Sequence, residues 1–351
     1  MSLSRPMSLT ASRTDSPLRR RADPRPRRVI AAVLMVTAVA GILTLTLGDY
    51  PVDVPGVWQA LIGAHEDRLA RYFVREIRLP RVIGAVLVGA ALGASGAIFQ
   101  SLSRNPLGSP DLIGFTTGAA TGALVEILLG TGSPTAVAGA AVLGGVASAV
   151  LIYLLAARRG VSGFRLVLVG VGIAAVLQSV NALLVVRADL AQAQSAAQWL
   201  AGSFNDIRWP GLVVLIPVLA VLLPWAIASR RSLDVLALGD ELAGALGVAV
   251  GRSRLLLIVV GVLLVAVATA AVGPIAFVAL GAPQVARRLT GASGPGVGAA
   301  AAVGGLLVLV CDVLAQRLFA PTQLAVGSVT GALGGAFLVW LLVVTWRGRR
   351  P

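Results

Sequence analysis

Long apolar runs, separated by short charged or Pro/Gly-rich breaks, follow one another from Val29 to Trp346. A run of about 20 apolar residues can cross the hydrocarbon core of a bilayer as an α-helix. The pattern predicts ten spans, at residues 29–47, 82–102, 112–130, 135–157, 164–186, 211–228, 255–273, 274–289, 296–315 and 324–346. The eighth is the weakest, because it is short and meets the seventh at Gly273 and Pro274. The predicted fold class is therefore all-α, a polytopic membrane protein of about ten helices.

Composition supports this prediction and narrows the chemistry. Of the 351 residues, 57% are hydrophobic and 13% charged, whereas about a quarter would be charged in a soluble domain. The chain has no lysine, so it has no P-loop lysine for ATP. One histidine, His65, and one cysteine, Cys311, cannot form a zinc site or an intramolecular disulfide. We expect a chain that is not an enzyme, with no catalytic residue, no metal site and no cofactor of its own.

All 29 basic residues are arginines, and they determine the predicted orientation. Short loops rich in basic residues stay in the cytoplasm. With ten spans and both termini in the cytoplasm, 21 arginines lie inside and 8 outside. The net charge of +14 is then a signal of topology and requires no nucleic-acid partner. We expect a multi-pass protein of the cytoplasmic membrane.

The chain divides into three parts by composition. Residues 1–28 are rich in Arg, Pro and Ser and are predicted to form a disordered cytoplasmic tail that contacts anionic lipid. Residues 29–347 form the transmembrane domain, and 348–351 the cytoplasmic C-terminal end. A cleaved signal peptide is the competing interpretation of the first apolar run. A retained span is favoured, because the run is longer than a typical h-region and no small-residue cleavage site follows it.

Two segments outside the spans have helical patterns. In residues 65–81, Arg68, Arg71, Arg75 and Arg78 recur at helical spacing beside an apolar face, which predicts an amphipathic helix on the outer side. Its arginines suit lipid phosphate or an acidic protein partner equally well.

The second segment, residues 230–254, lies on the cytoplasmic side and is predicted to form two short helices. Ser232 or Asp234 would cap the first and Gly239 would end it; Asp240 and Glu241 would open the second. Such a knob fits a groove on a soluble partner, or serves as a structured connector.

Polar residues inside the spans are few. Gln178 and Asn181 in the fifth span and Gln100 in the second must face either a partner helix or an aqueous pathway, and both remain open. Glu126 and Asp312 are the only acidic groups in the spans and lie toward the outer helix ends. Ion-coupled carriers use a carboxylate near the midplane, so we expect the energy for transport to come from another chain.

Glycines at four-residue spacing predict close helix packing. They form three stripes, at Gly89 and Gly93, at Gly114, Gly118 and Gly122, and at Gly327, Gly331 and Gly335. In the loop between the second and third spans, Asp111 is predicted to cap the following helix.

Four motifs resemble the signature of the vitamin B12 and iron-siderophore ABC importer permeases (type II importers). They are the run RLPRVIGA to TTGAATGA at 78–123, LGDELAGALGV at 238–248, GPIAFVALGAPQVARRL at 273–289, and LFAPTQLAVGSVTGALGG at 318–335. Many members carry Pro-His where this chain has Pro283 and Gln284. Pro-Gln is similar to the ferric-enterobactin-type subgroup, as are FVREIRLPR and NPLGSPDLIGFTTGA.

This resemblance implies a permease bundle of ten helices, paired with a second permease subunit and served by two ABC ATPase subunits that use ATP. It implies import of an iron(III)-siderophore complex, with a catecholate such as ferric enterobactin favoured, and a paralogous second permease rather than an identical one. Coupling to the ATPase would fall within about 232–249, at Leu238, Gly239, Asp240, Glu241, Ala245, Leu246 and Gly247. An extracytoplasmic siderophore-binding protein would dock on Arg78 and Arg81. The third docking arginine of the family is offset by one position here, at Arg317.

Three alternatives remain. The same family includes importers of haem or cobalamin. An ion-coupled secondary carrier would need a titratable group near the midplane, and a lipid-binding scaffold would have no ATPase partner.

Overall fold

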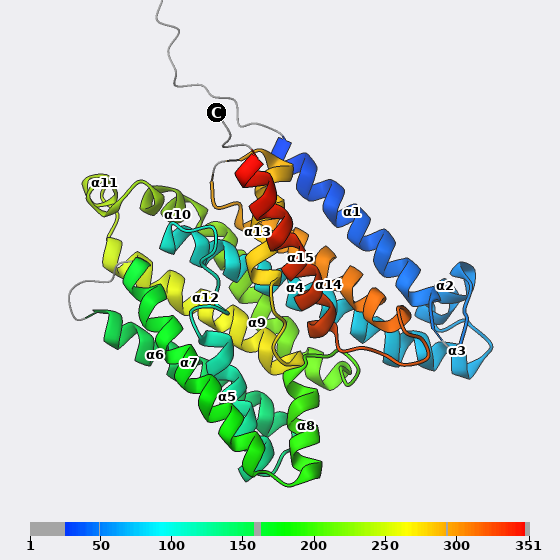
Figure 1. Ribbon diagram of the computed structural model, residues 1–351. Coiled ribbons are helices and arrows are strands. Elements are labelled where there is room, and N and C mark those ends of the chain that lie inside the picture. The colour runs from blue at the N-terminus through cyan, green and yellow to red at the C-terminus, as the bar shows by residue number, and fades with distance from the viewer. Residues whose placement is uncertain (1–24, 49, 158–162, 293, 348–351) are drawn as a thin grey trace, which may run out of the picture.

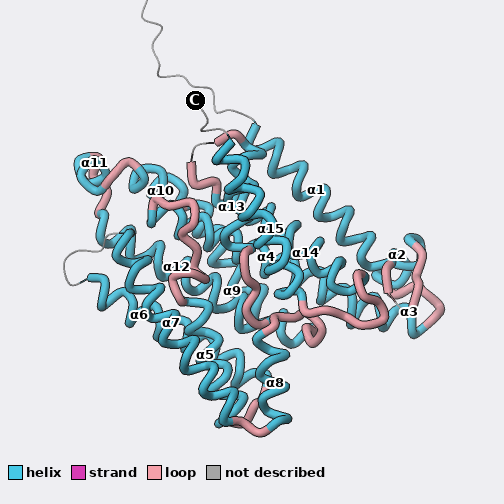
Figure 2. The backbone as a smooth tube through the Cα atoms, viewed as in Figure 1, coloured by secondary structure: helices cyan, strands magenta, loops and turns pink. Residues whose placement is uncertain are grey.

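A computed structural model describes residues 25–48, 50–157, 163–292 and 294–347. Most of the predicted tail at 1–28 and the C-terminal end at 348–351 fall outside these residues. The described residues form helices and connecting loops, with no strand among them (Figure 2). The predicted all-α class is confirmed.

The helices are α1 (Arg25–Thr46), α2 (Val54–Ile62), α3 (Arg68–Tyr72), the π-helical η1 (Phe73–Arg78), α4 (Leu79–Ser103), α5 (Phe115–Leu129), α6 (Pro134–Ala157), α7 (Gly163–Arg187), α8 (Leu190–Leu200), α9 (Trp209–Ala228), α10 (Arg230–Ala237), α11 (Asp240–Ala245), α12 (Val250–Val272), α13 (Val278–Thr290), α14 (Val297–Arg317) and α15 (Val326–Arg347). A helix lies at each of the ten predicted positions. The short helices α2 and α8 were not predicted.

Seven helical stretches in the described part of the chain are long and apolar enough to cross a membrane. They are α1, α6, α7, α9, α12, α14 and the continuous run of α3, η1 and α4. Helix α5 and the described apolar part of α15 are shorter, and α13 has only 13 residues. By length and composition, seven stretches of the described chain are candidate crossings, and the predicted count of ten is not confirmed.

The predicted break between the seventh and eighth spans is present. Gly273 (φ 77°) and Phe277 (φ 67°) have left-handed backbone angles between the end of α12 and the start of α13. The carbonyl of Val272 accepts a hydrogen bond from the amide of Ser203 at 2.8 Å. Irregular backbone at membrane depth needs such internal partners, and the short connection before α9 supplies one here.

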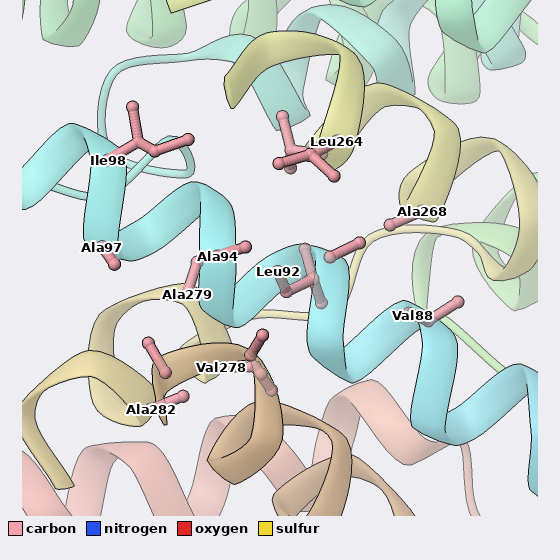
Figure 3. Close-up of a cluster of buried hydrophobic side chains, with 14 of the residues drawn as sticks. Val88, Leu92, Ala94, Ala97, Ile98, Leu264, Ala268, Val278, Ala279 and Ala282 are labelled. Atoms are coloured by element: carbon pink, nitrogen blue, oxygen red, sulfur yellow. The ribbon is translucent and has the colours of Figure 1, made fainter. Parts of the chain in front are cut away.

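Helix α4 lies at the centre of the bundle and packs on α12, α13 and α14. In Figure 3, Val88, Leu92 and Ile98 of α4 lie among small and branched side chains of α12 and α13, such as Leu264 and Ala279. Small residues predominate in this core. They allow backbones to approach closely, which holds helices together in lipid.

Two of the three glycine stripes pack as predicted. A Cβ on Gly93 would lie 2.2 Å from the carbonyl oxygen of Ala300 in α14, and one on Gly122 would lie 2.1 Å from that of Ala140 in α6. The third stripe departs from the prediction. Only Gly327 is packed, whereas a Cβ on Gly331 or Gly335 would meet nothing within 4 Å. The helix face of α15 around these two glycines is open, because none of the described helices covers it.

The short helices gather at the two ends of the bundle (Figure 1). Helices α10 and α11 lie at the same end as the beginning of α1 and the end of α15, and α2, α3 and α8 lie at the other. Helix α10 begins at Arg230, so Ser232 and Asp234 lie inside it and do not cap it as predicted. Asp111 does not cap α5 either: Gly114 occupies the N-cap position.

Candidate functional site

Helices α10 and α11 form the predicted cytoplasmic knob, which projects from one end of the bundle (Figure 1). Gly239 (φ 117°) separates the two helices, as predicted, and Gly247 (φ 81°) follows the second. Leu238, Leu242 and Leu246 recur every four residues and are 59%, 57% and 64% exposed. Leu242 and Leu246 lie one helical turn apart, on α11 and at its C-terminal cap, whereas Leu238 ends α10 before the break at Gly239. All three leucines are exposed, and no other described element covers them.

The remaining predicted coupling residues differ in their surroundings. Glu241 and Ala245 are exposed on α11, and the glycines at 239 and 247 have open space around them. Asp240 is different, because two arginines from other parts of the chain converge on its carboxylate. Arg104, at the end of α4, donates to Oδ1 at 2.8 Å. Arg254, in the first turns of α12, donates to Oδ1 at 2.8 Å and to Oδ2 at 3.2 Å.

This cluster has a clear electrostatic character. The Arg254 side chain is 10% exposed, whereas those of Arg104 and Asp240 are about half exposed. The hydrogen bonds and charge of Arg254, with a smaller contribution from Arg104, hold the pKa of the Asp240 carboxyl below its usual range. Asp240 therefore stays ionised on α11 at any physiological pH. Sequence reasoning missed Arg104 and Arg254, which it counted only as topology signals.

At the opposite end of the bundle from the knob (Figure 1), the predicted docking residue Arg78 is buried. Its guanidinium donates to the carbonyl of Leu45 at 2.8 Å and to that of Tyr50. A π-helical segment ends at Arg78, and its wider turn moves this residue off the face that simple 3.6-residue spacing assigned. Arg71 and Arg75 likewise donate to carbonyls at the end of α2, at 3.3 and 2.9 Å.

Arg81 is also engaged within the chain. Its Nε and Nη2 each lie 2.9 Å from a carboxylate oxygen of Asp312 in α14, and Nη1 donates to Gln323 at 3.2 Å. The Asp312 side chain is 1% exposed and that of Arg81 is 11% exposed. Gln316 donates to the same carboxylate at 2.8 Å. Arg317, the third predicted docking residue, is exposed at the end of α14, one residue beyond Gln316.

Two of the three pathway candidates line one cavity. Gln178 and Asn181 of α7 border a cavity of about 550 Å³ that also touches α5, α8 and Pro274. Asn181 Oδ1 is buried without a hydrogen-bond partner among the described residues. Gln100 lies elsewhere: it donates to the Leu280 carbonyl of α13 at 2.9 Å and accepts from Arg287 at 2.7 Å. The structure thus separates Gln100 from the other two.

Acidic groups lie near the ends of helices in the described chain. Glu126 binds the loop after α5 through Thr131 at 2.9 Å, and Asp312 is paired with Arg81. Within the described residues, no three His, Cys, Asp or Glu side chains come close enough to hold a metal ion.

The chain is similar in sequence to a known family of membrane transport proteins. Residues 36–344 match the model of the FecCD transport family. The ferric enterobactin transport system permease protein FepG of Escherichia coli K12 is 46% identical over 319 residues, covering 90% of this chain and 96% of that protein. The vitamin B12 import system permease protein BtuC of Citrobacter koseri is 34% identical over 322 residues, 90% of this chain and 93% of that protein.

A solved structure of a metal-chelate type ABC transporter in an inward-facing conformation matches with a TM-score of 0.82. It shares 25% sequence identity, over 90% of this chain and 99% of that one. A family match along nearly the whole chain, a relative at 46% identity and a shared fold agree with the motif resemblance. The chain belongs to the FecCD transport family.

Proposed function

We propose that this chain is the membrane-spanning permease subunit of an ATP-driven importer that carries an iron(III)-siderophore complex across the cytoplasmic membrane. The 46% identity to a ferric enterobactin permease along 90% of the chain carries this proposal. A catecholate complex is the favoured substrate, since the 34% identity to a vitamin B12 permease is lower.

Uptake of radiolabelled iron tests the substrate. Cells that depend on this chain for import are supplied with iron as a catecholate complex, as a hydroxamate complex or as haem, and cobalamin uptake is measured in parallel. Catecholate-dependent uptake supports the proposal. Uptake of haem or cobalamin alone would assign the chain to another branch of the family.

The alternative of an ion-coupled carrier can be tested separately. Collapsing the proton gradient while ATP is supplied should leave uptake intact if the energy comes from ATPase subunits. Loss of uptake under those conditions would favour an ion-coupled carrier.

Topologically, we propose ten crossings, with α5, α13 and α15 completing the seven long ones, and both termini in the cytoplasm. Helices α5 and α13 can cross although they are short, because the chain itself covers them: α13 packs on α4 and α14, and α5 on α6 and α7. Backbone that is shielded in this way need not span the full hydrocarbon thickness as a regular helix. Helix α15 has 22 residues.

The knob is proposed as the site of coupling to the ATPase. Its exposed leucines, Leu238 at the end of α10 and Leu242 and Leu246 along α11, supply the apolar contact, and Glu241 and Ala245 lie on α11. An exposed apolar face on the cytoplasmic side is typical of a protein interface.

A single substitution tests this contact. Replacing Leu246 by Asp should abolish co-purification of the ATPase with the permease. The matched control is Leu107→Asp, because Leu107 is an equally apolar residue, 47% exposed in the α4–α5 loop and outside the knob. Equal loss in both variants would contradict the assignment.

The extracytoplasmic binding protein is proposed to dock at the outer ends of α4 and α14. Arg317 supplies the exposed charge there, and Arg81 and Arg78 complete the set taken from the family motif. Arg pairs strongly with carboxylates. Arg81 is already paired with Asp312. A carboxylate of the binding protein would therefore have to compete with the Asp312 carboxylate for the Arg81 guanidinium.

Reversing Arg317 to Glu should weaken binding of that protein and make its salt dependence shallower. The control is Arg68→Glu, which changes the net charge equally at another exposed outer position. The same loss of affinity in both variants would point to overall charge rather than to docking at α14.

A second permease subunit, a paralogue by the family resemblance, is proposed to cover the open face of α15. Gly331 and Gly335 have open space there, and Leu333 and Val339 are 48% and 67% exposed. Lipid would cover the remaining exposed apolar surface, and two ATPase subunits would complete the importer.

The cavity beside α7 is proposed to border the pathway, with Gln178 and Asn181 as lining residues. The unpartnered Oδ1 of Asn181 supports this, since a buried amide oxygen normally has a donor or water. Asn181→Leu and Gln178→Leu should reduce uptake. Ser179→Ala is the control, because the Ser179 hydroxyl bonds its own helix at 3.0 Å and does not line the cavity.

A further inference from the structure

We propose that Asp240 is an internal positioning residue rather than a contact to the ATPase. Through its carboxylate, the knob, the cytoplasmic end of α4 and the start of α12 move as one unit. This inference rests on the proposed function, in which the knob receives the motion of the ATPase. It adds the route by which that motion reaches the transmembrane helices.

The geometry of the carboxylate carries the first step. Three hydrogen bonds reach it from Arg104 and Arg254, and Arg104 also donates to the Leu236 carbonyl of α10 at 3.2 Å. The residues joined are 136 and 14 positions away from Asp240 in the chain. Asp240 is therefore a point at which charged side chains attach the knob to α4 and α12, beside the apolar packing of Leu233, Leu236 and Ala243.

The strength of this attachment follows from its environment. An isolated, exposed ion pair contributes little to stability. Here the pairing with Arg254 is bidentate and its guanidinium is largely buried, and charge-assisted bonds of that kind are about twice as strong as neutral ones. Without the carboxylate, Arg104 and Arg254 would lose their shared counter-charge and repel each other. Loss of Asp240 should thus loosen the knob from the end of α4 and the start of α12.

A second set of hydrogen bonds extends the unit to α13. Gln100, one turn before Arg104 on α4, accepts from Arg287 at 2.7 Å and donates to Leu280 at 2.9 Å. Gln284 donates to the carbonyl of Pro106 at 3.0 Å, so α13 holds the loop after α4 as well. The cytoplasmic end of α4 is in this way joined to the knob on one side and to α13 on the other.

Uptake and assembly measured in one complex test the inference. In the importer purified with its ATPase, Asp240→Asn should retain the ATPase and its basal hydrolysis within about twofold. Uptake should fall by about tenfold, the effect of one charged hydrogen bond. Arg254→Gln should act in the same direction. Arg252→Gln is the control, since Arg252 is exposed on the same helix and forms none of the ion pairs seen in the described residues.

Two outcomes would overturn the inference. Uptake at the wild-type rate in Asp240→Asn would show that the carboxylate is not needed to couple the movement of the knob to α4 and α12. Loss of the ATPase from the purified complex would make Asp240 an interface contact. If the unsubstituted permease binds no ATPase and shows no ATP-driven uptake, the proposed function fails instead.

A distance measurement on the full-length permease, without the ATPase, tests the role of Asp240 independently of the proposed function. Cys311 is the only cysteine, so Cys311→Ala gives a background for spin labels at Gly244→Cys on α11 and Leu107→Cys after α4. Both sites are exposed. The label-to-label distance should have one narrow distribution, which Asp240→Asn broadens. If the distance distribution in Asp240→Asn is as narrow as in the unsubstituted protein, Asp240 does not attach the knob to α4, whatever the uptake shows.

Discussion

At the scale of single residues, the arginines have three roles in this structure that their positions in the sequence do not separate. Arg78 bonds backbone carbonyls and is buried, Arg81 is paired with a buried carboxylate, and Arg317 is exposed. The one property they share in the sequence is a positive charge on the predicted outer side. Whether each guanidinium is available to another protein depends on its burial and on its hydrogen-bond partners within this chain.

The Arg81–Asp312 pair gives a prediction on stability. Asp312→Asn should lower the free energy of unfolding by about 3 kcal/mol, because breaking a buried ion pair leaves an uncompensated charge. The measurement is the thermal midpoint of the purified protein in detergent. The double variant Arg81→Met/Asp312→Leu removes both charges and should recover most of the loss. A double variant as unstable as Asp312→Asn would mean that the pair itself contributes the stability.

Asp111 gives a prediction on pH. It lies in the loop between α4 and α5, where Thr116 donates to Oδ1 at 2.6 Å and Oδ2 is buried without a partner among the described residues. Burial raises the pKa of this carboxyl to about 6. The folded state therefore holds the proton more tightly than the unfolded one. Stability is lost as the pH rises from about 4 to above 6.

Asp111→Asn keeps the acceptor for Thr116 and removes the buried charge. It should stabilise the protein at pH 7.5 by about 2 kcal/mol and have little effect at pH 4.5. Thermal midpoints at the two pH values check this. A gain that is equal at both pH values would contradict the role of ionisation.

At the scale of elements, close contact between α4 and α14 depends on glycine. A Cβ on Gly89 would lie 2.3 Å from the Gly304 carbonyl oxygen, and Gly93 faces Ala300 as closely. Such contacts involve backbone, which cannot move aside as a flexible side chain would. The sequence predicts this stripe and the one on α15 equally well, and only the structure distinguishes the packed stripe from the open one.

Gly93→Ala should therefore force α4 and α14 apart. We expect a loss of about 1–3 kcal/mol in stability, the usual range for overpacking, seen as a lower thermal midpoint and a smaller folded fraction in size-exclusion chromatography. Gly331→Ala is the matched control, because its Cβ meets nothing within 4 Å in this chain. Equal destabilisation in both would contradict the packing argument.

At the scale of the whole molecule, the two ends of the bundle differ in what they present. The knob of α10 and α11 occupies one end, and α2, α3 and α8 occupy the other (Figure 1). The arginine bias predicts that the knob lies in the cytoplasm. Coupling on one side and docking on the other both depend on this orientation.

Accessibility to a membrane-impermeant thiol reagent tests the orientation. In the Cys311→Ala background, Ile62→Cys at the end of α2 should react in intact cells, whereas Gly244→Cys should react only after the membrane is opened. Both positions are exposed, Ile62 by 60%. The reverse pattern would invert the proposed topology. The unsubstituted background should not react under either condition.

Local sequence features predict the helical class, a helix at each of ten positions, the break before α13 and the family, because apolar periodicity, helix breakers and short motifs are properties of neighbouring residues. The sequence predicted the knob, but not the arginines that hold Asp240. It located Gln178 and Asn181, but could not separate them from Gln100. These points follow from the folded structure, since burial and side-chain partners depend on which distant segments meet. Arg104 and Asp240, 136 positions apart, become neighbours only when α4 and α10 pack together.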